Sequence, residues 1–243
     1  MTTIKENIFR VRAEIARICQ KVRRDPREIT LVAVTKFAPL EAIQEAIDCG
    51  ITDIAENKVQ EGLKKYPSLK SSDPQRPCKR HLIGHLQTNK VKDALKIFDL
   101  IQSMDSLKLA QEIDQQALYH YGAGQAQKLN RRIEILVQVN ISGEEQKFGL
   151  GKSEARDLVG KILELENIHI LGLMTMAPLT DDQKIMRECF KGLRELKDEV
   201  IRDFKGNPNM DMKFLSMGMS GDYSIALEEG ANMIRIGRAI FQD

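Results

Sequence analysis

Several features that would assign a function class are absent from the sequence. The formal net charge of its 243 residues is only +2, and lysine and arginine alternate with aspartate and glutamate along the chain. Nucleic-acid-binding proteins usually concentrate basic residues on one face, so we expect no nucleic-acid partner. No segment is long and apolar enough to span a bilayer, and charged residues follow Met1-Thr2-Thr3-Ile4. We therefore expect no membrane association and no signal peptide.

Cysteine and histidine are scarce and poorly spaced for metal binding. The four cysteines match no zinc-ligand spacing, which favours free thiols in a reducing compartment and predicts a cytoplasmic protein. His81 and His85 lie close together, but no third ligand stands at a suitable spacing. We therefore predict no metal site. We interpret His81, in a predicted strand, as a packed core residue.

The composition is that of a globular domain, with 42% hydrophobic and 30% charged residues. A length of 243 residues is normal for one α/β barrel. No low-complexity linker divides the chain, and residues 68–79 and 121–130 contain the turn-forming residues expected of surface loops. We predict a single domain over residues 1–243.

Strand and helix patterns alternate along the chain. Apolar residues at helical spacing predict an amphipathic helix over 3–24, which Asp25-Pro26 is expected to end. Short apolar runs predict buried strands at 29–35, 53–55, 81–83, 100–103, 133–139, 168–173, 213–216 and 233–236. The clearest helices between them are predicted over 39–49, 106–119 and 181–204, the second with Ser106 as its N-cap.

Eight strands separated by helices predict the α/β class and, within it, a closed (β/α)8 TIM barrel. Little chain follows the eighth predicted strand, so the extra N-terminal helix is expected to cover the place of the last barrel helix. An open doubly wound sheet is the alternative. It is not favoured, because the first strand is not followed by the Gly-x-Gly-x-x-Gly pattern of dinucleotide-binding folds.

Lys36 directly follows the first predicted strand, on the side to which Val32 and Val34 point. Catalytic groups of barrels gather at this carboxyl-terminal end of the strands. An amine that is partly shielded from water there has a lowered pKa and can form a Schiff base with an aldehyde. A lysine that simply leaves the strand for solvent is an equally good interpretation of this residue alone.

Two glycine-bearing segments, 216–222 and 235–238, follow or end the seventh and eighth predicted strands. In barrels a phosphate often binds between these two loops, on backbone N–H groups. The first and eighth strands are neighbours in a closed barrel, so Arg235 and Lys36 are expected to face one ligand, and a phosphorylated aldehyde suits two cations. The alternatives are two tight turns with helix caps, and an ion pair between Arg235 and an acid such as Glu56.

Blocks of sequence along most of the chain resemble one family. They are Val34-Thr35-Lys36, 56–61, 81–90, Lys147-Phe148-Gly149, Gly172-Leu173-Met174, 215–220, Arg235-Ile236-Gly237 and Phe241. With these blocks the chain resembles the pyridoxal phosphate homeostasis proteins from about Val11 to its C-terminus. Ala55, where the family commonly has glycine, and Lys58, where an aromatic residue is frequent, are departures from its pattern.

The resemblance implies a fold-type III barrel with pyridoxal 5′-phosphate as the cofactor. Lys36 is then the residue that holds the cofactor as a Schiff base, and Arg235 lies by the pyridine nitrogen. Phosphate contacts fall to Ser216 and Ser220 and to the backbone amides of Gly237 and Arg238. Asn57 and Met174 are expected to line the pocket.

The resemblance also implies a role in cofactor homeostasis, by buffering or delivery, with no catalytic turnover. An arginine leaves the pyridine nitrogen unprotonated, which makes the ring a weaker electron sink, and an open site excludes water poorly. The related barrel of alanine racemase carries a second domain, for which we expect no room after the eighth strand, and a tyrosine acid/base with no counterpart here.

Two other functions stay open at the level of the sequence. One is a pyridoxal-phosphate-dependent racemase or lyase acting on amino acids, and the other is a cofactor-free aldolase that uses Lys36 on a sugar phosphate. The expected partners are the cofactor and apo-enzymes that depend on it. A monomer is expected, because a single barrel can be complete alone.

Overall fold

The computed structural model describes residues 3–71, 77–122, 132–144 and 148–242, and its strands close into a barrel. The strands are β1 (Thr30–Val34), β2 (Asp53–Glu56), β3 (Lys79–Leu82), β4 (Leu100–Met104), β5 (Ile133–Gln138), β6 (Ile168–Met174), β7 (Met210–Ser216) and β8 (Met233–Ile236). Each strand is parallel to the next, and β8 pairs with β1, so the predicted (β/α)8 barrel is confirmed.

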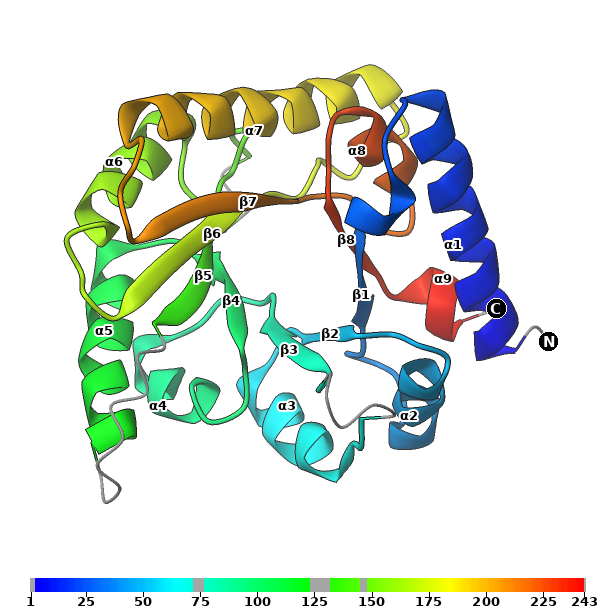
Figure 1. The fold of residues 1–243 in the computed structure, drawn as a ribbon, viewed down its shortest axis with the longest axis horizontal. Coiled ribbons are helices and arrows are strands. Elements are labelled where there is room, and N and C mark those ends of the chain that lie inside the picture. Colours follow the sequence, from blue (N-terminus) through cyan, green and yellow to red (C-terminus); the bar gives the residue numbers. More distant parts are fainter. Residues whose placement is uncertain (1–2, 72–76, 123–131, 145–147, 243) are drawn as a thin grey trace.

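Helices surround the barrel on its outer side (Figure 1). They are α1 (Ile4–Lys21), α2 (Leu40–Asp48), α3 (Val59–Lys65), α4 (Val91–Ala94), α5 (Leu107–Gly122), α6 (Lys152–Ile162), α7 (Gln183–Asp203), α8 (Tyr223–Glu228) and α9 (Arg238–Phe241). In the described ranges they are accompanied by the 3₁₀ turns η1 (Pro26–Glu28), η2 (Tyr66–Ser68) and η3 (Thr88–Lys90). Ser106 caps α5 as predicted, because its hydroxyl accepts from the Leu109 N–H.

The N-terminal helix α1 fills the place beside the short α9, as the sequence predicted (Figure 1). The buried Asn7 side chain donates to the Ile240 carbonyl at 3.1 Å, which ties the two ends of the chain together. The predicted stop at Asp25-Pro26 is wrong by a few residues. The helix ends at Lys21 because Arg23 takes a left-handed conformation (φ 56°), and Asp25 instead caps η1.

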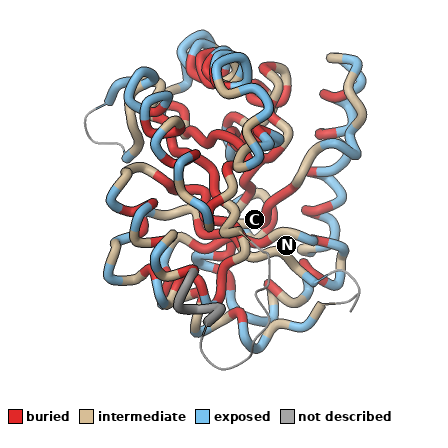
Figure 2. The backbone as a smooth tube through the Cα atoms, turned by 60° about the vertical axis from the view of Figure 1, so that its left-hand side comes forward, coloured by how far each residue is buried: buried red, intermediate tan, exposed pale blue. Residues whose placement is uncertain are grey.

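Two apolar layers result from the alternation of side chains along the strands. Leu31 and Ala33 of β1 face outward and pack under the helices, whereas Val32 faces inward with Phe214 and Met233. Figure 2 shows the buried backbone concentrated in the strands and on the inner faces of the helices. The interior layer forms the floor beneath the carboxyl-terminal mouth of the barrel.

Some sequence predictions fall outside the described residues. Residues 72–76 of the first predicted loop, 123–130 of the second, and Lys147 of the family pattern belong to this group. Within the described ranges, the four cysteines are free thiols, and no helix is long and apolar enough to cross a membrane. In the same ranges, His, Cys, Asp and Glu form no group of three or more that would suit a metal ion.

Candidate functional site

Lys36 lies in the turn after β1, at the carboxyl-terminal mouth of the barrel. Its side chain is exposed, and its Nζ lies 5.2 Å from the centroid of the Phe37 ring. The partial shielding from water that the sequence predicted is therefore wrong. Val32 and Val34 pack toward the interior as expected, but a turn closed by the Ala38 N–H and the Thr35 carbonyl carries Lys36 beyond the sheet.

A buried polar cluster holds the backbone directly before Lys36. The Thr35 hydroxyl lies 3.0 Å from the Glu56 carboxylate and 3.2 Å from the Tyr66 hydroxyl. Lys65 Nζ donates to Glu56 Oε1 at 2.8 Å and to the Thr35 carbonyl at 3.0 Å. Burial raises the pKa of Tyr66 far above its usual value, so its hydroxyl stays protonated. We call Thr35, Glu56, Lys65 and Tyr66 the Thr35 cluster; it fixes the start of the Lys36 turn.

Arg235 lies inside the barrel on β8, where it pairs with Val32 of β1, and it is only 3% exposed. Its Nη1 donates to Ser216 Oγ at 2.7 Å, and its Nη2 donates to the Thr175 carbonyl at 2.8 Å. Burial lowers the pKa of Arg235 to about 10, against an opposing effect of the Asp222 charge, so the guanidinium remains charged at neutral pH. Three of its five N–H groups remain for a ligand or water.

The ion pair between Arg235 and Glu56 that the sequence left open is not formed. Glu56 is fully buried, and its carboxylate binds Lys65, Thr35 and the N–H of Asn57 instead. The Arg235 guanidinium is thus held by two neutral groups, the Ser216 hydroxyl and the Thr175 carbonyl.

The loops after β7 and β8 meet at the mouth, where Ser220 Oγ accepts from the Ala239 N–H at 3.4 Å. Within the described part of the chain, the N–H groups of Ser220, Gly221, Gly237 and Arg238 donate to no protein acceptor. Free backbone donors from two adjoining loops are the groups that a phosphate binds. The donor set therefore fits the phosphate of pyridoxal phosphate.

Gly218 shapes the first of these loops. Its φ of +94° lies in the left-handed region, and a Cβ there would lie 2.6 Å from the Ala226 Cβ. A larger residue at this position would push the loop off α8. The turn itself therefore requires Gly218, which belongs to the glycine-bearing segment that suggested an anion site in the sequence.

The other predicted site residues divide between the mouth and the interior. Asn57 lies half-buried just after β2, with its carbonyl against Gly84. Met174 is fully buried in the interior layer with Val32 and Phe214, below the mouth. Ser216 is also fully buried, and its hydroxyl donates to Gln102 at 2.6 Å while it accepts from Arg235.

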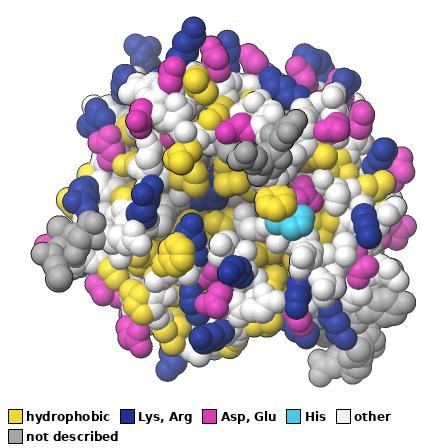
Figure 3. Space-filling model, turned by 180° about the vertical axis from the view of Figure 1, so that it is seen from behind, with side chains coloured by type: hydrophobic (Ala, Val, Ile, Leu, Met, Phe, Trp, Pro, Cys, Tyr) yellow, Lys and Arg dark blue, Asp and Glu magenta, His cyan; other side chains and the backbone are white. Residues whose placement is uncertain are grey.

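The mouth opens into a hollow on the face seen in Figure 3, where basic and apolar side chains surround the centre. Exposed apolar residues occur in the loops after β1, β5, β6 and β7, namely Phe37, Phe148, Leu179 and Met219. His85 stacks on Phe148 with 4.4 Å between ring centroids, and its Nδ1 lies 2.9 Å from Asp105 Oδ2. Gln138 donates to the Phe148 carbonyl, which holds this part of the rim to the barrel.

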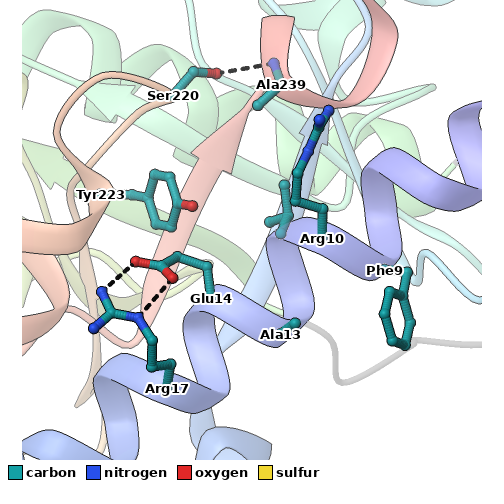
Figure 4. A pocket seen from close by; sticks show the side chains of 9 residues that line it. Phe9, Arg10, Ala13, Glu14, Arg17, Ser220, Tyr223 and Ala239 are labelled. Atoms are coloured by element: carbon teal, nitrogen blue, oxygen red, sulfur yellow. Dashed lines mark hydrogen bonds and ion pairs between the residues drawn. The ribbon is translucent and has the colours of Figure 1, made fainter. Parts of the chain in front are cut away.

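A separate hollow of about 680 Å³ lies outside the barrel, between α1 and the β7–α8 loop (Figure 4). Arg10, Glu14 and Arg17 line one side, and Arg17 forms an ion pair with Glu14 at 2.6 Å. Ser220 and Ala239 line the other side, so the hollow reaches the outer surface of the loops after β7 and β8. Lys36 and Arg235 do not line it, and it is therefore distinct from the mouth.

The sequence interpretation missed Gln102, Thr175 and Gln138. Gln102 is fully buried in β4 and contacts Ser216, and the Thr175 carbonyl holds Arg235. A glutamine in the middle of an apolar strand was the available signal, since uncharged polar residues are seldom fully buried without a partner. Thr175 gave no signal, because it acts through its main chain.

Comparison with known proteins shows the family to which this chain belongs. The family described as "Alanine racemase, N-terminal domain" matches residues 7–243. The pyridoxal phosphate homeostasis protein of Aquifex aeolicus is 39% identical over 236 residues, which cover 97% of this chain and 96% of that protein. The chain belongs to the pyridoxal phosphate homeostasis protein family.

Two solved structures resemble this family member along nearly its whole length. An unknown protein from Bifidobacterium adolescentis has a TM-score of 0.88 and 33% identity, and the match covers 98% of this chain and 94% of that one. PipY of Synechococcus elongatus, solved with pyridoxal phosphate bound, has a TM-score of 0.76 and 32% identity. That match covers 93% of this homeostasis-family chain and 99% of PipY.

Proposed function

We propose that this protein binds pyridoxal 5′-phosphate at the barrel mouth and serves cofactor homeostasis without catalytic turnover. One observation carries the proposal: Lys36 presents an exposed amine in the turn after β1, while the charged Arg235 lies on the hydrogen-bonded neighbour β8, and the loop after β8 offers free N–H groups. The names of the Aquifex aeolicus relative and of the pyridoxal-phosphate-bound PipY structure support it.

We assign one role to each site residue. Lys36 binds the cofactor aldehyde. Asn57 lines the pocket beside Lys36, and Met174 lines it from below. Ser220 and the amides of Gly237 and Arg238 bind the phosphate, with the amide of Gly221 as a further donor. Ser216 was expected among the phosphate contacts; because its hydroxyl binds Arg235 and Gln102, we assign it to holding Arg235.

Arg235 is the group that favours binding over catalysis. When bound, pyridoxal phosphate supplies an aldehyde and a ring that can accept electrons if its nitrogen is protonated. An arginine can only donate hydrogen bonds, so Arg235 faces an unprotonated nitrogen and weakens that electron sink. The exposed Lys36 turn also leaves water near the reacting carbon, which hinders carbanion chemistry.

The alternative is a racemase or lyase, because the barrel is shared with the alanine racemase family. Turnover assays with panels of amino acids separate the two functions. Sustained turnover that disappears in Lys36→Ala would replace the binding function with an enzymatic one. Delivery to apo-enzymes, a monomeric state, the cytoplasmic location and one binding domain over residues 1–243 remain predictions.

The decisive experiment is the absorption spectrum of wild type and Lys36→Ala, before and after borohydride. We expect a visible Schiff-base band in the wild type, its loss in Lys36→Ala, and a reduced label on the peptide that contains Lys36. Lys36 is exposed, so the variant should keep its stability within about 0.5 kcal/mol. Lys58→Ala, an exposed lysine just after β2, is the matched control and should keep the band.

Two results would contradict this function. A wild type that stays colourless after pyridoxal phosphate is added would exclude this cofactor, and the Schiff-base aldolase would become the leading function. If borohydride reduction labelled Lys36→Ala with the same yield as the wild type, the cofactor would be attached to another lysine.

A further inference from the structure

Five polar side chains form a continuous chain of hydrogen bonds across the barrel interior. Arg235 contacts Ser216 at 2.7 Å, Ser216 contacts Gln102 at 2.6 Å, Gln102 contacts His81 at 2.8 Å, and His81 contacts Asp53 at 3.0 Å. They come from β8, β7, β4, β3 and β2 in turn. Ser216, Gln102 and His81 are fully buried. We call these five residues the interior chain.

The two ends of the interior chain determine the direction of every hydrogen bond in it. Arg235 can only donate, so the Ser216 hydroxyl accepts from it and must give its own proton to Gln102 Oε1. The amide nitrogen of Gln102 therefore faces His81 and donates to Nδ1. This leaves His81 Nε2 as the protonated nitrogen, and it donates to the Asp53 carboxylate.

The far end carries a negative charge that complements Arg235. Burial raises the pKa of Asp53, but the hydrogen bonds that its carboxylate accepts from His81 and Thr52 and the nearby charge of Lys79 lower it further, so the net shift is downward. An ionised carboxylate at one end and a guanidinium at the other polarise the three neutral groups between them in the same sense. Rotation of the Arg235 guanidinium would leave a buried acceptor unpaired in this series.

We propose that Gln102 and His81 are positioning residues, which fix the guanidinium of Arg235 in the orientation that receives the ligand. The proposal rests on the proposed function only for the identity of that ligand, pyridoxal phosphate. Neither residue reaches the mouth; each acts through Ser216. Asp53, at the start of β2, sets the polarity of the series from the end opposite Arg235.

The first test uses the protein without added cofactor. In ¹⁵N-histidine NMR spectra, His81, assigned by its loss in His81→Asn, should show a protonated Nε2 and a hydrogen-bonded, unprotonated Nδ1. Gln102→Leu should shift the Nδ1 resonance toward that of a free ring nitrogen. Gln138→Leu, which replaces another buried glutamine of the barrel, is the matched control and should leave it unchanged. A proton on Nδ1 in the wild type would overturn the proposal.

The second test measures pyridoxal phosphate affinity and the position of its visible band. Gln102→Leu should weaken binding roughly tenfold, because Ser216 and Arg235 lose their fixed geometry. Gln102→Glu keeps an acceptor for Ser216 but cannot donate to His81, so it should retain most of the affinity while it alters the His81 resonances. Thermal unfolding of each variant shows whether it is folded.

The outcomes separate this proposal from the proposed function. If the wild type binds no pyridoxal phosphate but His81 shows the expected tautomer, the function fails and the interior chain stands. If Gln102→Leu is folded and binds with wild-type affinity and an unshifted band, the positioning role is overturned while the function stands.

Discussion

Lys65→Met is expected to destabilise the protein by about 3–5 kcal/mol, the usual cost of leaving a buried charge without its partner. Glu56 is fully buried and Lys65 is 14% exposed, so the carboxylate would lose the cation that contacts it, in a site that water barely reaches. Thr35 would also lose the ammonium on its carbonyl, which loosens the turn that carries Lys36. Urea unfolding gives the stability, and the rate of borohydride labelling gives the effect on Lys36.

Two further variants isolate the charge effect. Lys96→Met breaks a pair of similar length, 2.7 Å, between side chains that are nearly half exposed, and it should cost under about 1 kcal/mol. Adding Glu56→Gln to Lys65→Met removes the unpaired charge and should restore part of the stability. Equal losses in Lys65→Met and Lys96→Met would show that the Thr35 cluster contributes no more than a surface pair.

Gly84→Ala is expected to cost about 3 kcal/mol and to weaken pyridoxal phosphate binding, since overpacking against rigid backbone is at the upper end of such costs. A Cβ on Gly84 would lie 2.1 Å from the Asn57 carbonyl oxygen and 2.8 Å from its carbonyl carbon. Gly84 cannot retreat freely, because its own carbonyl accepts from Ser103 Oγ at 2.7 Å. The backbone of Asn57, at the edge of the site, would therefore have to move.

The matched control for this variant is Gly160→Ala in α6. The added methyl would meet only the tip of the Phe204 ring, at 3.3 Å, and alanine suits a helix better than glycine, so stability should change by no more than about 1 kcal/mol. Unfolding curves and cofactor titrations of both variants test the expectation. Wild-type affinity in a destabilised Gly84→Ala would mean that Asn57 keeps its position or does not contact the ligand.

The barrel could be predicted from the sequence because a parallel sheet buried on both faces leaves a local pattern. Each strand is a short apolar run, and all eight predicted strands occur within a few residues of their expected limits. The pairing of β1 with β8 then followed from closure, and it placed Arg235 on the strand next to the one that Lys36 follows. The exposure of Lys36 could not be predicted, because side-chain alternation ends where the strand ends.

The interior chain left almost no local signal. Its contacts join residues 19, 114, 21 and 28 positions apart in sequence, and they depend on which residues share one level of the barrel. Register shifts in β4–β5, β5–β6 and β6–β7 alter that level in ways that composition does not reveal. Ser216 was therefore expected on the phosphate, when its hydroxyl instead points to Gln102.

The one-way polarity of the interior chain has a consequence for how this family can diverge. A single apolar replacement at Ser216, Gln102 or His81 leaves a hydrogen-bonding group without a partner on both sides of it. Two neighbouring residues that are replaced together by a complementary donor and acceptor can keep every group paired. These positions are therefore epistatic, and a lineage that changes one of them is under selection to change its neighbour. Relatives should then fall into a few discrete combinations at these sites, separated by gaps that single mutations seldom cross.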